Sequence, residues 1–286
     1  MPELPEVETV VNHLSNELIG KIIFSIDSPN DYMRVFHEIS LEDCNVFFHN
    51  QVIDKVWRRG KYIIFSLTNG FLCIHLRMTG KLLTTLENPK DFKYVSAEFT
   101  FSDQSKLYFK DIRKFGRIYC SSTLNWLEEK LGIEPLSAGF TPQWLLTQLN
   151  KKNRKMKALL LDQSFIAGLG NIYIDEALWR AGIHPGRISS TLTQSMVERL
   201  HFSIIDILHR AIEAKGTTFL SFSYGENGKG EFIDNLQVFG KQGLPCPNCN
   251  TPIVKKIIAQ RGTHFCPSCQ ISTNKLKEST HADITG

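Results

Sequence analysis

Apolar positions follow a helical pattern near the start of the chain and again in its second half. We expect a helix from about Glu6 to Ile19, ended by Gly20, because apolar residues recur there every three or four positions. Its apolar face consists of Val7, Val10, Val11, Leu14 and Leu18. Helical spacing returns from Thr141 to about Ala214, which predicts several packed helices in that region.

Between these helical regions the apolar pattern is typical of strands. Two apolar runs, 61–67 and 71–76, flank Asn69-Gly70, a dipeptide that favours a tight β-hairpin. Alternation over 95–101 predicts another strand, and a polar turn and a further strand follow it. The first part of the chain therefore predicts a β-rich domain with a helix packed against it.

Changes of texture along the chain divide it into parts, so we expect an α+β multidomain protein. The parts are an N-terminal domain over 1–131, a linker over 132–140, a helical domain over 141–235 containing a mobile loop at about 216–230, a small β module over 236–270, and a disordered tail over 271–286.

Four of the seven cysteines have the spacing of a metal site. Cys246-Pro-Asn-Cys249 and Cys266-Pro-Ser-Cys269 are separated by sixteen residues, which is typical of a zinc module. Four thiolates close the coordination shell of the ion, so this one Zn²⁺ is expected to be structural. Two disulfides are the alternative, and a reduced compartment disfavours them. Strands over 253–258 and 263–265 would form the hairpin of the module. The remaining cysteines, Cys44, Cys73 and Cys120, are scattered; Cys73 and Cys120 lie in apolar strand-like runs and are expected to pack as small apolar residues.

The composition restricts the classes of binding partner but does not identify one. The 286 residues carry a formal net charge of +4, which permits a nucleic-acid partner but does not require it. The chain has no run of eighteen apolar residues and no signal-peptide pattern, so we expect a cytoplasmic protein that does not span a membrane.

The first residues carry a possible nucleophile. Removal of Met1 would leave Pro2 with a free secondary amine, and an α-amino group has a pKa of roughly 7.7–8.0. Such an amine attacking a sugar C1′ forms an iminium, with Glu3 beside it as a proton-transfer partner. The alternative is that Pro2 and Pro5 only stiffen a helix entry, with Glu6 and Glu8 near the positive end of the helix dipole.

Several motifs together resemble one family. They are Pro2-Glu3-Leu4-Pro5-Glu6-Val7-Glu8-Thr9, Arg58-Arg-Gly-Lys61-Tyr62, His75-Leu-Arg-Met78-Thr-Gly80, Asp111-Ile-Arg113-Lys-Phe115-Gly116, Gly168-Leu-Gly-Asn171-Ile-Tyr173 and the four cysteines. In this order, from residue 2 to about 270, the chain resembles the bacterial formamidopyrimidine-DNA glycosylases. The resemblance implies an N-terminal β-sandwich with a flanking helix, a helix–two-turn–helix domain and a C-terminal β-hairpin zinc finger. Damaged double-stranded DNA would lie in the cleft between them, and the loop at 216–230 would recognise the lesion.

The resemblance also implies roles for individual residues. Catalytic roles fall on Pro2, Glu3, Lys61 and Arg261; DNA-binding roles fall on His75, Met78, Arg113, Phe115, Lys152, Lys157 and Asn171; and Glu6 and Glu176 would order the active site. Among the DNA-binding set, Met78, Arg113 and Phe115 would fill the space left by a flipped-out base. One departure is Phe92-Lys93-Tyr94-Val95, which stands where the family often has a DNA-contacting histidine.

Each of these assignments has an alternative based on the residues alone. Met78 and Phe115 would pack in the core, Lys61 and the basic run at 151–157 would be solvated surface charge, and Arg261 would be a surface arginine. Gly168 to Asn171 would form only a turn between helices, with Asn171 as a cap.

The expected function is that of a monomeric bifunctional DNA glycosylase and abasic-site lyase acting on 8-oxoguanine and formamidopyrimidines. The first alternative is an endonuclease VIII-like enzyme for oxidised pyrimidines. Leu4, together with Arg113 and Phe115, argues against it, because that branch typically has Gly at the fourth position. The second alternative is a zinc-ribbon DNA-binding protein without catalysis, which gives Pro2 and Glu3 no role.

Overall fold

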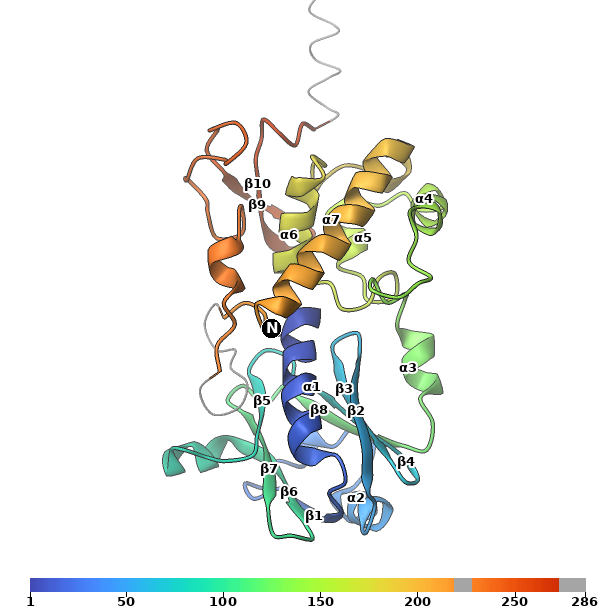
Figure 1. Ribbon diagram of the computed structural model, residues 1–286, viewed down its shortest axis with the longest axis vertical. Coiled ribbons are helices and arrows are strands. Elements are labelled where there is room, and N and C mark those ends of the chain that lie inside the picture. The colour runs from blue at the N-terminus through green and yellow to red at the C-terminus, as the bar shows by residue number, and fades with distance from the viewer. Residues whose placement is uncertain (219–227, 273–286) are drawn as a thin grey trace, which may run out of the picture. The chain divides into compact units, whose positions relative to one another are not determined.

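The computed structural model describes residues 1–218 and 228–272, and its helices and strands are labelled in Figure 1. Most of the loop expected at 216–230 and of the tail expected at 271–286 lies outside the described residues. Contacts divide the chain into two compact units. The first unit comprises Met1–Lys130 and Ala211–Ile233, and the second comprises Leu131–Arg210 and the described residues from Asp234 onward.

Helix α1 (Leu4–Leu18) begins two residues earlier than expected. The earlier start follows from a capping box, in which the Glu3 side chain accepts from the backbone of Glu6 and the Glu6 side chain accepts from the backbone of Glu3. Pro5 in the first turn has no N–H to lose there. The apolar face packs on strands β2 (Ile53–Arg59) and β3 (Tyr62–Leu67) (Figure 1), and full burial of a side chain such as Leu14 stabilises the fold by about 1.5–3 kcal/mol.

Two four-stranded antiparallel sheets make up the body of the first unit. One has the order β1 (Ile23–Asp27), β6 (Val95–Phe101), β7 (Lys106–Asp111), β5 (Gly80–Leu83), and the other β2 (Ile53–Arg59), β3 (Tyr62–Leu67), β4 (Gly70–His75), β8 (Arg117–Ser121). Side chains of both sheets and of α1 share one apolar core, in which Phe65 and Phe109 are fully buried. The expected β-sandwich with a flanking helix is therefore confirmed.

Shorter elements complete this unit. They are η1 (Met33–Val35), α2 (Leu41–Phe48), η2 (Pro89–Tyr94) and α3 (Asn125–Lys130). The expected hairpin at Asn69-Gly70 joins β3 to β4, with Leu67 opposite Gly70. Gly70 has a φ of +98°, and a Cβ there would lie 2.7 Å from the Phe47 ring, so the turn requires glycine.

The second unit is helical at its centre. Its helices are α4 (Pro142–Asn150), α5 (Met156–Leu160), α6 (Asn171–Arg180) and α7 (Gln194–Glu213, of which the residues up to Arg210 belong to this unit), with η3 (Ser189–Thr191) before α7. Thr141 caps α4 by accepting from the Trp144 N–H at 3.1 Å. The segment expected as a linker packs into this unit, because Gly132 donates to the Gln163 carbonyl and buried Phe140 stacks on His201.

The second unit ends in a two-stranded hairpin, β9 (Val254–Ile258) and β10 (Arg261–Phe265), which η4 (Phe232–Asn235) precedes in the chain. The turn consists of Ala259 and Gln260, both with positive φ, as in the tight turns that match the twist of a hairpin. Arg261 therefore opens β10 opposite Ile258, two residues before the expected start of this strand at Thr263.

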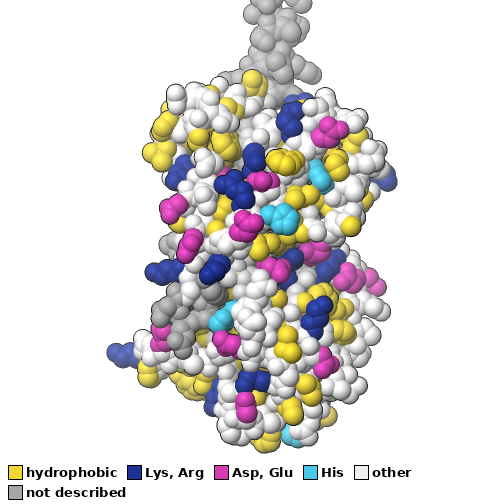
Figure 2. All heavy atoms as spheres, viewed as in Figure 1, with side chains coloured by type: hydrophobic (Ala, Val, Ile, Leu, Met, Phe, Trp, Pro, Cys, Tyr) yellow, Lys and Arg dark blue, Asp and Glu magenta, His cyan; other side chains and the backbone are white. Residues whose placement is uncertain are grey.

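No helix within the described residues is long and apolar enough to cross a membrane. Figure 2 shows basic and acidic side chains intermingled on the face it displays, in keeping with the small formal net charge of +4.

Candidate active site and nucleic-acid interface

The N-terminal carboxylates form a buried network within the first unit. Glu3 and Glu6 are only 3% and 2% exposed. The Glu3 N–H donates to Glu6 Oε2 at 2.8 Å, and the Thr217 N–H donates to Glu6 Oε1 at 2.7 Å. Glu6 thus fixes the backbone next to Pro2 and the backbone at the edge of the 216–230 segment. Pro2 itself is buried, and its nitrogen is an amide while Met1 is attached.

Lys61, in the turn before β3, and His75, the last residue of the neighbouring strand β4, are both buried. Lys61 is 5% exposed, so its interpretation as a solvated surface lysine is wrong. His75 accepts the Arg77 N–H at Nδ1 and packs edge-on against Tyr62. Burial, and then the charges of Arg77, Lys61 and Lys130, lower the pKa of His75 to about 3. The imidazole is therefore neutral at physiological pH, and its contact with DNA stays a prediction.

Met78, Arg113 and Phe115 come together as one exposed cluster. Met78 follows β4, and the other two lie between β7 and β8. Arg113 Nη1 lies 3.0 Å from Met78 Sδ, and its guanidinium lies 4.8 Å from the centre of the Phe115 ring. Met78 is 41% exposed and Phe115 is 46% exposed, so the interpretation of either residue as core packing is wrong.

A buried carboxylate that the sequence analysis assigned no role holds this cluster in place. Asp111 is 1% exposed and accepts the N–H groups of Arg113 at 3.2 Å and Gly116 at 2.7 Å, together with the Thr79 hydroxyl. A Cβ on Gly116 would lie 2.3 Å from the Phe109 ring, so the loop passes too close to β7 for any larger residue. The sequence signal was the first position of the Asp-x-Arg-x-Phe-Gly motif.

The basic run at 151–157 divides into exposed and buried members in the second unit. Lys152 is exposed, as a phosphate contact requires. Lys157 is fully buried, and its ammonium lies 2.6 Å from Asp175 Oδ1 and 3.2 Å from the Asn171 carbonyl. The expectation that Lys157 meets DNA directly is therefore corrected. Its ammonium has no exposed surface in this arrangement and instead neutralises the charge of Asp175.

Asn171 is the first residue of α6 and not its cap, which is Gly170. The expected capping role is wrong because the Asn171 side chain turns to the finger hairpin, where Nδ2 donates to the Gly262 carbonyl at 3.0 Å. Its Oδ1 is buried and has no hydrogen-bond partner in the described part of the chain. A buried acceptor left unpaired at a helix N-terminus is unusual and marks a candidate functional position.

Glu176 accepts three successive backbone N–H groups. They belong to Gln237, Val238 and Phe239, at distances of 2.8–3.1 Å. Burial raises the pKa of Glu176, and these N–H groups oppose the rise. Glu176 therefore orders the segment that leads into the zinc module, and its role around Pro2 stays a prediction.

The four cysteines of the second unit are arranged for one metal ion. Their sulfur atoms all lie within 4.8 Å of one another, with Cys246 and Cys269 at 3.9 Å and Cys249 and Cys266 at 3.4 Å. Bonds of about 2.3 Å to a tetrahedral Zn²⁺ separate sulfur atoms by about 3.8 Å, so the donor set fits zinc. Trp179 Nε1 donates to Cys246 Sγ at 3.4 Å and joins the finger to α6.

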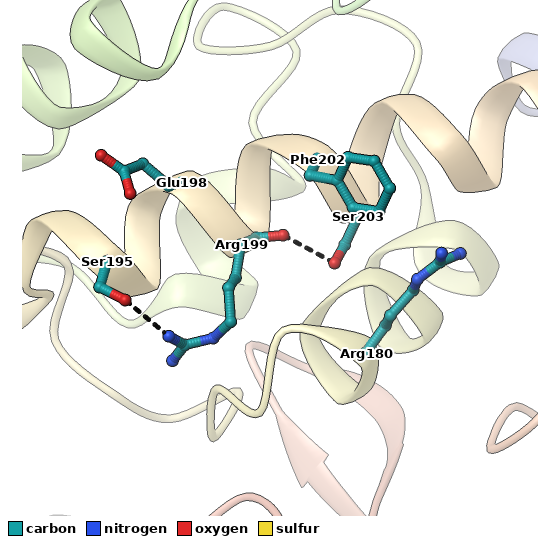
Figure 3. Close-up of a pocket in the computed structure, with 6 residues that line it drawn as sticks. All are labelled: Arg180, Ser195, Glu198, Arg199, Phe202 and Ser203. Carbon is teal, nitrogen blue, oxygen red and sulfur yellow. Dashed lines mark hydrogen bonds between the residues drawn. The ribbon is translucent and has the colours of Figure 1, made fainter.

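A surface pocket of about 420 Å³ lies between α6 and α7 (Figure 3). Arg199 donates to Ser195 Oγ, and Arg180 pairs with Asp206 and lies over the Phe202 ring. Both arginines of this pocket are therefore already hydrogen-bonded within the protein. None of the expected site residues lines the pocket.

Family models match three successive parts of the chain. They are the formamidopyrimidine-DNA glycosylase N-terminal domain over residues 1–118, the H2TH domain of the same glycosylase over 131–223, and the zinc finger found in FPG and IleRS over 243–271. Together they cover the β-sandwich, the helices and the cysteine cluster.

Full-length relatives and solved structures agree with these matches. The formamidopyrimidine-DNA glycosylase of Pelotomaculum thermopropionicum is 41% identical and that of Halalkalibacterium halodurans 39%, each match covering 94% of this chain and at least 99% of the relative. A structure of MutM with carbocyclic 8-oxo-G DNA has a TM-score of 0.86 at 39% identity, covering 95% of this chain and all of that one. A structure of a Lactococcus lactis FPG mutant with Fapy-dG DNA also has a TM-score of 0.86, at 38% identity and the same coverage.

The sandwich, the helical unit and the four-cysteine finger define a zinc-finger DNA glycosylase with a helix–two-turn–helix domain. This architecture and the full-length relatives disfavour the non-catalytic zinc-ribbon alternative and the endonuclease VIII alternative. The chain belongs to the formamidopyrimidine-DNA glycosylase family.

Proposed function

We propose that this bifunctional DNA glycosylase and abasic-site lyase excises 8-oxoguanine and formamidopyrimidines from DNA through a Schiff base on Pro2. Family membership supports the activity, and the related structures with carbocyclic 8-oxo-G and Fapy-dG DNA support the substrate class. The observation that carries the mechanism is the buried Glu6 carboxylate, which holds the backbone N–H next to Pro2.

The reaction begins with removal of Met1, which converts the Pro2 nitrogen from an amide to a secondary amine. This nitrogen bonds to C1′ of the lesion nucleotide as the glycosidic bond breaks, and the base leaves with the bonding electrons and gains a proton. Loss of the N–H proton leaves a neutral amine on C1′, whose lone pair then expels O4′. The C1′–O4′ bond breaks, O4′ takes up a proton, and the opened sugar carries an iminium that acidifies the C2′ proton. β-Elimination and then δ-elimination release the two phosphates. Glu3, buried next to Pro2, moves protons in these steps, with Lys61 and Arg261 assisting.

The exposed cluster of Met78, Arg113 and Phe115 would enter the duplex where the lesion leaves it. A flexible thioether, a planar cation and an aromatic ring suit that task, because extruding a base costs a few kcal/mol of stacking and pairing. Lys152, Asn171 and Arg261 would contact phosphates and make affinity salt-dependent. His75 would support the same surface from β4.

Cys246, Cys249, Cys266 and Cys269 would hold one Zn²⁺, which supplies folding free energy to the finger. The folded finger presents Arg261 at the start of β10. We further propose that the protein works as a monomer in the cytoplasm, on damaged double-stranded DNA.

Borohydride trapping tests the Pro2 mechanism. The processed enzyme is incubated with a duplex containing 8-oxoguanine opposite cytosine, reduced, and mapped by mass spectrometry. A covalent adduct on the N-terminal peptide is expected. An N-terminally extended form, in which Pro2 stays an amide, is the matched control and should bind an abasic-analogue duplex without forming an adduct. An adduct on Lys61 would overturn the proposal.

A further inference from the structure

Asp175 lies at the centre of a fully buried charge network in the second unit. Its side chain and that of Lys157 both have 0% exposure, and the ammonium lies 2.6 Å from Oδ1. Oδ2 accepts the His264 N–H at 2.8 Å and lies 3.4 Å from His264 Nδ1. One carboxylate therefore joins three elements, α5, α6 and β10.

A second connection repeats the link between α6 and β10. Asn171 Nδ2 donates to the Gly262 carbonyl, one helical turn before Asp175 and two residues before His264. Positions four apart share a helix face, and positions two apart share a strand face. The two hydrogen bonds therefore fix both the distance and the register of β10 along α6, which lie side by side (Figure 1).

Lys157 adds a third tie. Besides pairing with Asp175, its ammonium donates to the carbonyl of Asn171, the first residue of α6. The exposed Arg261 directly precedes Gly262 in β10. The network thus connects to Asn171 and Arg261, to which the proposed function assigns DNA contacts. Asp175 and Lys157 themselves are buried and would not touch DNA.

We infer that Asp175 is a positioning residue, which holds β10 on α6 so that Arg261 and Asn171 act as one two-point phosphate site. The inference rests on the proposed function and deepens it. Removing only one member of a buried ion pair leaves an uncompensated charge and destabilises a protein for that reason alone. The test must therefore remove both charges together.

Two double variants separate positioning from charge balance. Asp175→Asn with Lys157→Met keeps an oxygen acceptor for the His264 N–H, whereas Asp175→Leu with Lys157→Met does not. Both remove the buried charges at similar volume. We expect wild-type zinc content in both. Both variants have also lost the Lys157 tie to the Asn171 carbonyl, so they are compared with each other, and affinity for an abasic-analogue duplex should be about tenfold lower in the second than in the first, as for loss of one charged contact. Equal affinity of the two variants would overturn the inference.

A thermodynamic cycle with Arg261→Ala tests whether Asp175 acts through Arg261. Arg261→Ala should weaken binding strongly in the wild-type background and much less in the Leu/Met background, because residues that act as a unit are not additive. Additive losses would contradict the inference. Asp175→Ala with Lys157→Met replaces the Leu/Met variant if that one does not fold. Borohydride trapping of the wild type is the separate control, since its failure would reject the proposed function and not the positioning role.

Discussion

The Thr217 backbone N–H donates to Glu6 Oε1 at 2.7 Å, although the two residues are 211 positions apart in the sequence. The other oxygen of the same carboxylate accepts the Glu3 N–H. Gly216 has a positive φ, and a Cβ there would lie 2.9 Å from Glu6 Oε1, so the backbone approaches the carboxylate closely. Glu6 therefore couples the residue next to the proposed nucleophile to the segment expected to cover the lesion.

Glu6→Gln should slow formation of the trapped adduct about tenfold or more, because the amide can accept only one of the two N–H groups and has no charge. Single-turnover trapping on an 8-oxoguanine duplex measures the rate. Glu8→Gln on the same helix is the matched control, since Glu8 pairs with Arg58 and is not part of this network. Equal rates for the two variants would contradict the coupling.

Arg113→Ala and Phe115→Ala should each reduce excision of 8-oxoguanine from duplex DNA by about ten- to a hundredfold, because the space left by the base costs about 1–3 kcal/mol when unfilled. Cleavage of a preformed abasic site should change much less, since no base remains to be extruded. Phe24→Ala is the control, because Phe24 is 49% exposed and lies in β1, outside the cluster. Equal losses on both substrates would show that the cluster does not fill the duplex.

His75 predicts a pH-dependent stability. Its pKa is about 3 in the folded protein and about 6.5 when unfolded, so between these values the unfolded chain binds more protons. The free energy of unfolding should therefore fall as the pH falls, by about 2 kcal/mol from pH 7 to pH 5 for this group. Urea unfolding of wild type and His75→Gln measures the difference in slope. His209→Gln, on the exposed side of α7, should retain the wild-type slope; a wild-type slope for His75→Gln would reject the assignment.

The elements of the fold follow from local patterns in the sequence. The helix period before Gly20 and the Asn69-Gly70 turn predicted α1 and the β3–β4 hairpin, because each depends on neighbouring residues. The cysteine spacing likewise predicted the metal cluster. The expected starts of two elements were wrong. Helix α1 begins earlier because of the capping box at Glu3, and β10 begins earlier, at Arg261, because the hairpin turn has only two residues.

The contacts of the site residues depend on partners that no local pattern reveals. Lys157 stands in a basic run that indicates a solvated face, but it is buried against Asp175, eighteen residues away on another helix. Met78 and Arg113 meet across thirty-five residues. The signal for Asp175 was a carboxylate within the apolar run 172–179, where a buried charge requires a partner.

Zinc removal should unfold the finger and weaken DNA binding, and it should also change the fluorescence of Trp179 in α6. Chelation, or Cys249→Ser, should release the metal and weaken binding to an abasic-analogue duplex about tenfold or more, because the hairpin that carries Arg261 loses its folding free energy. Trp179 fluorescence should change in step, since its indole N–H donates to Cys246 Sγ. Adding Zn²⁺ back should restore both signals in the wild type but not in Cys249→Ser. Undiminished DNA affinity after complete loss of the metal would show that the finger does not present Arg261 to DNA.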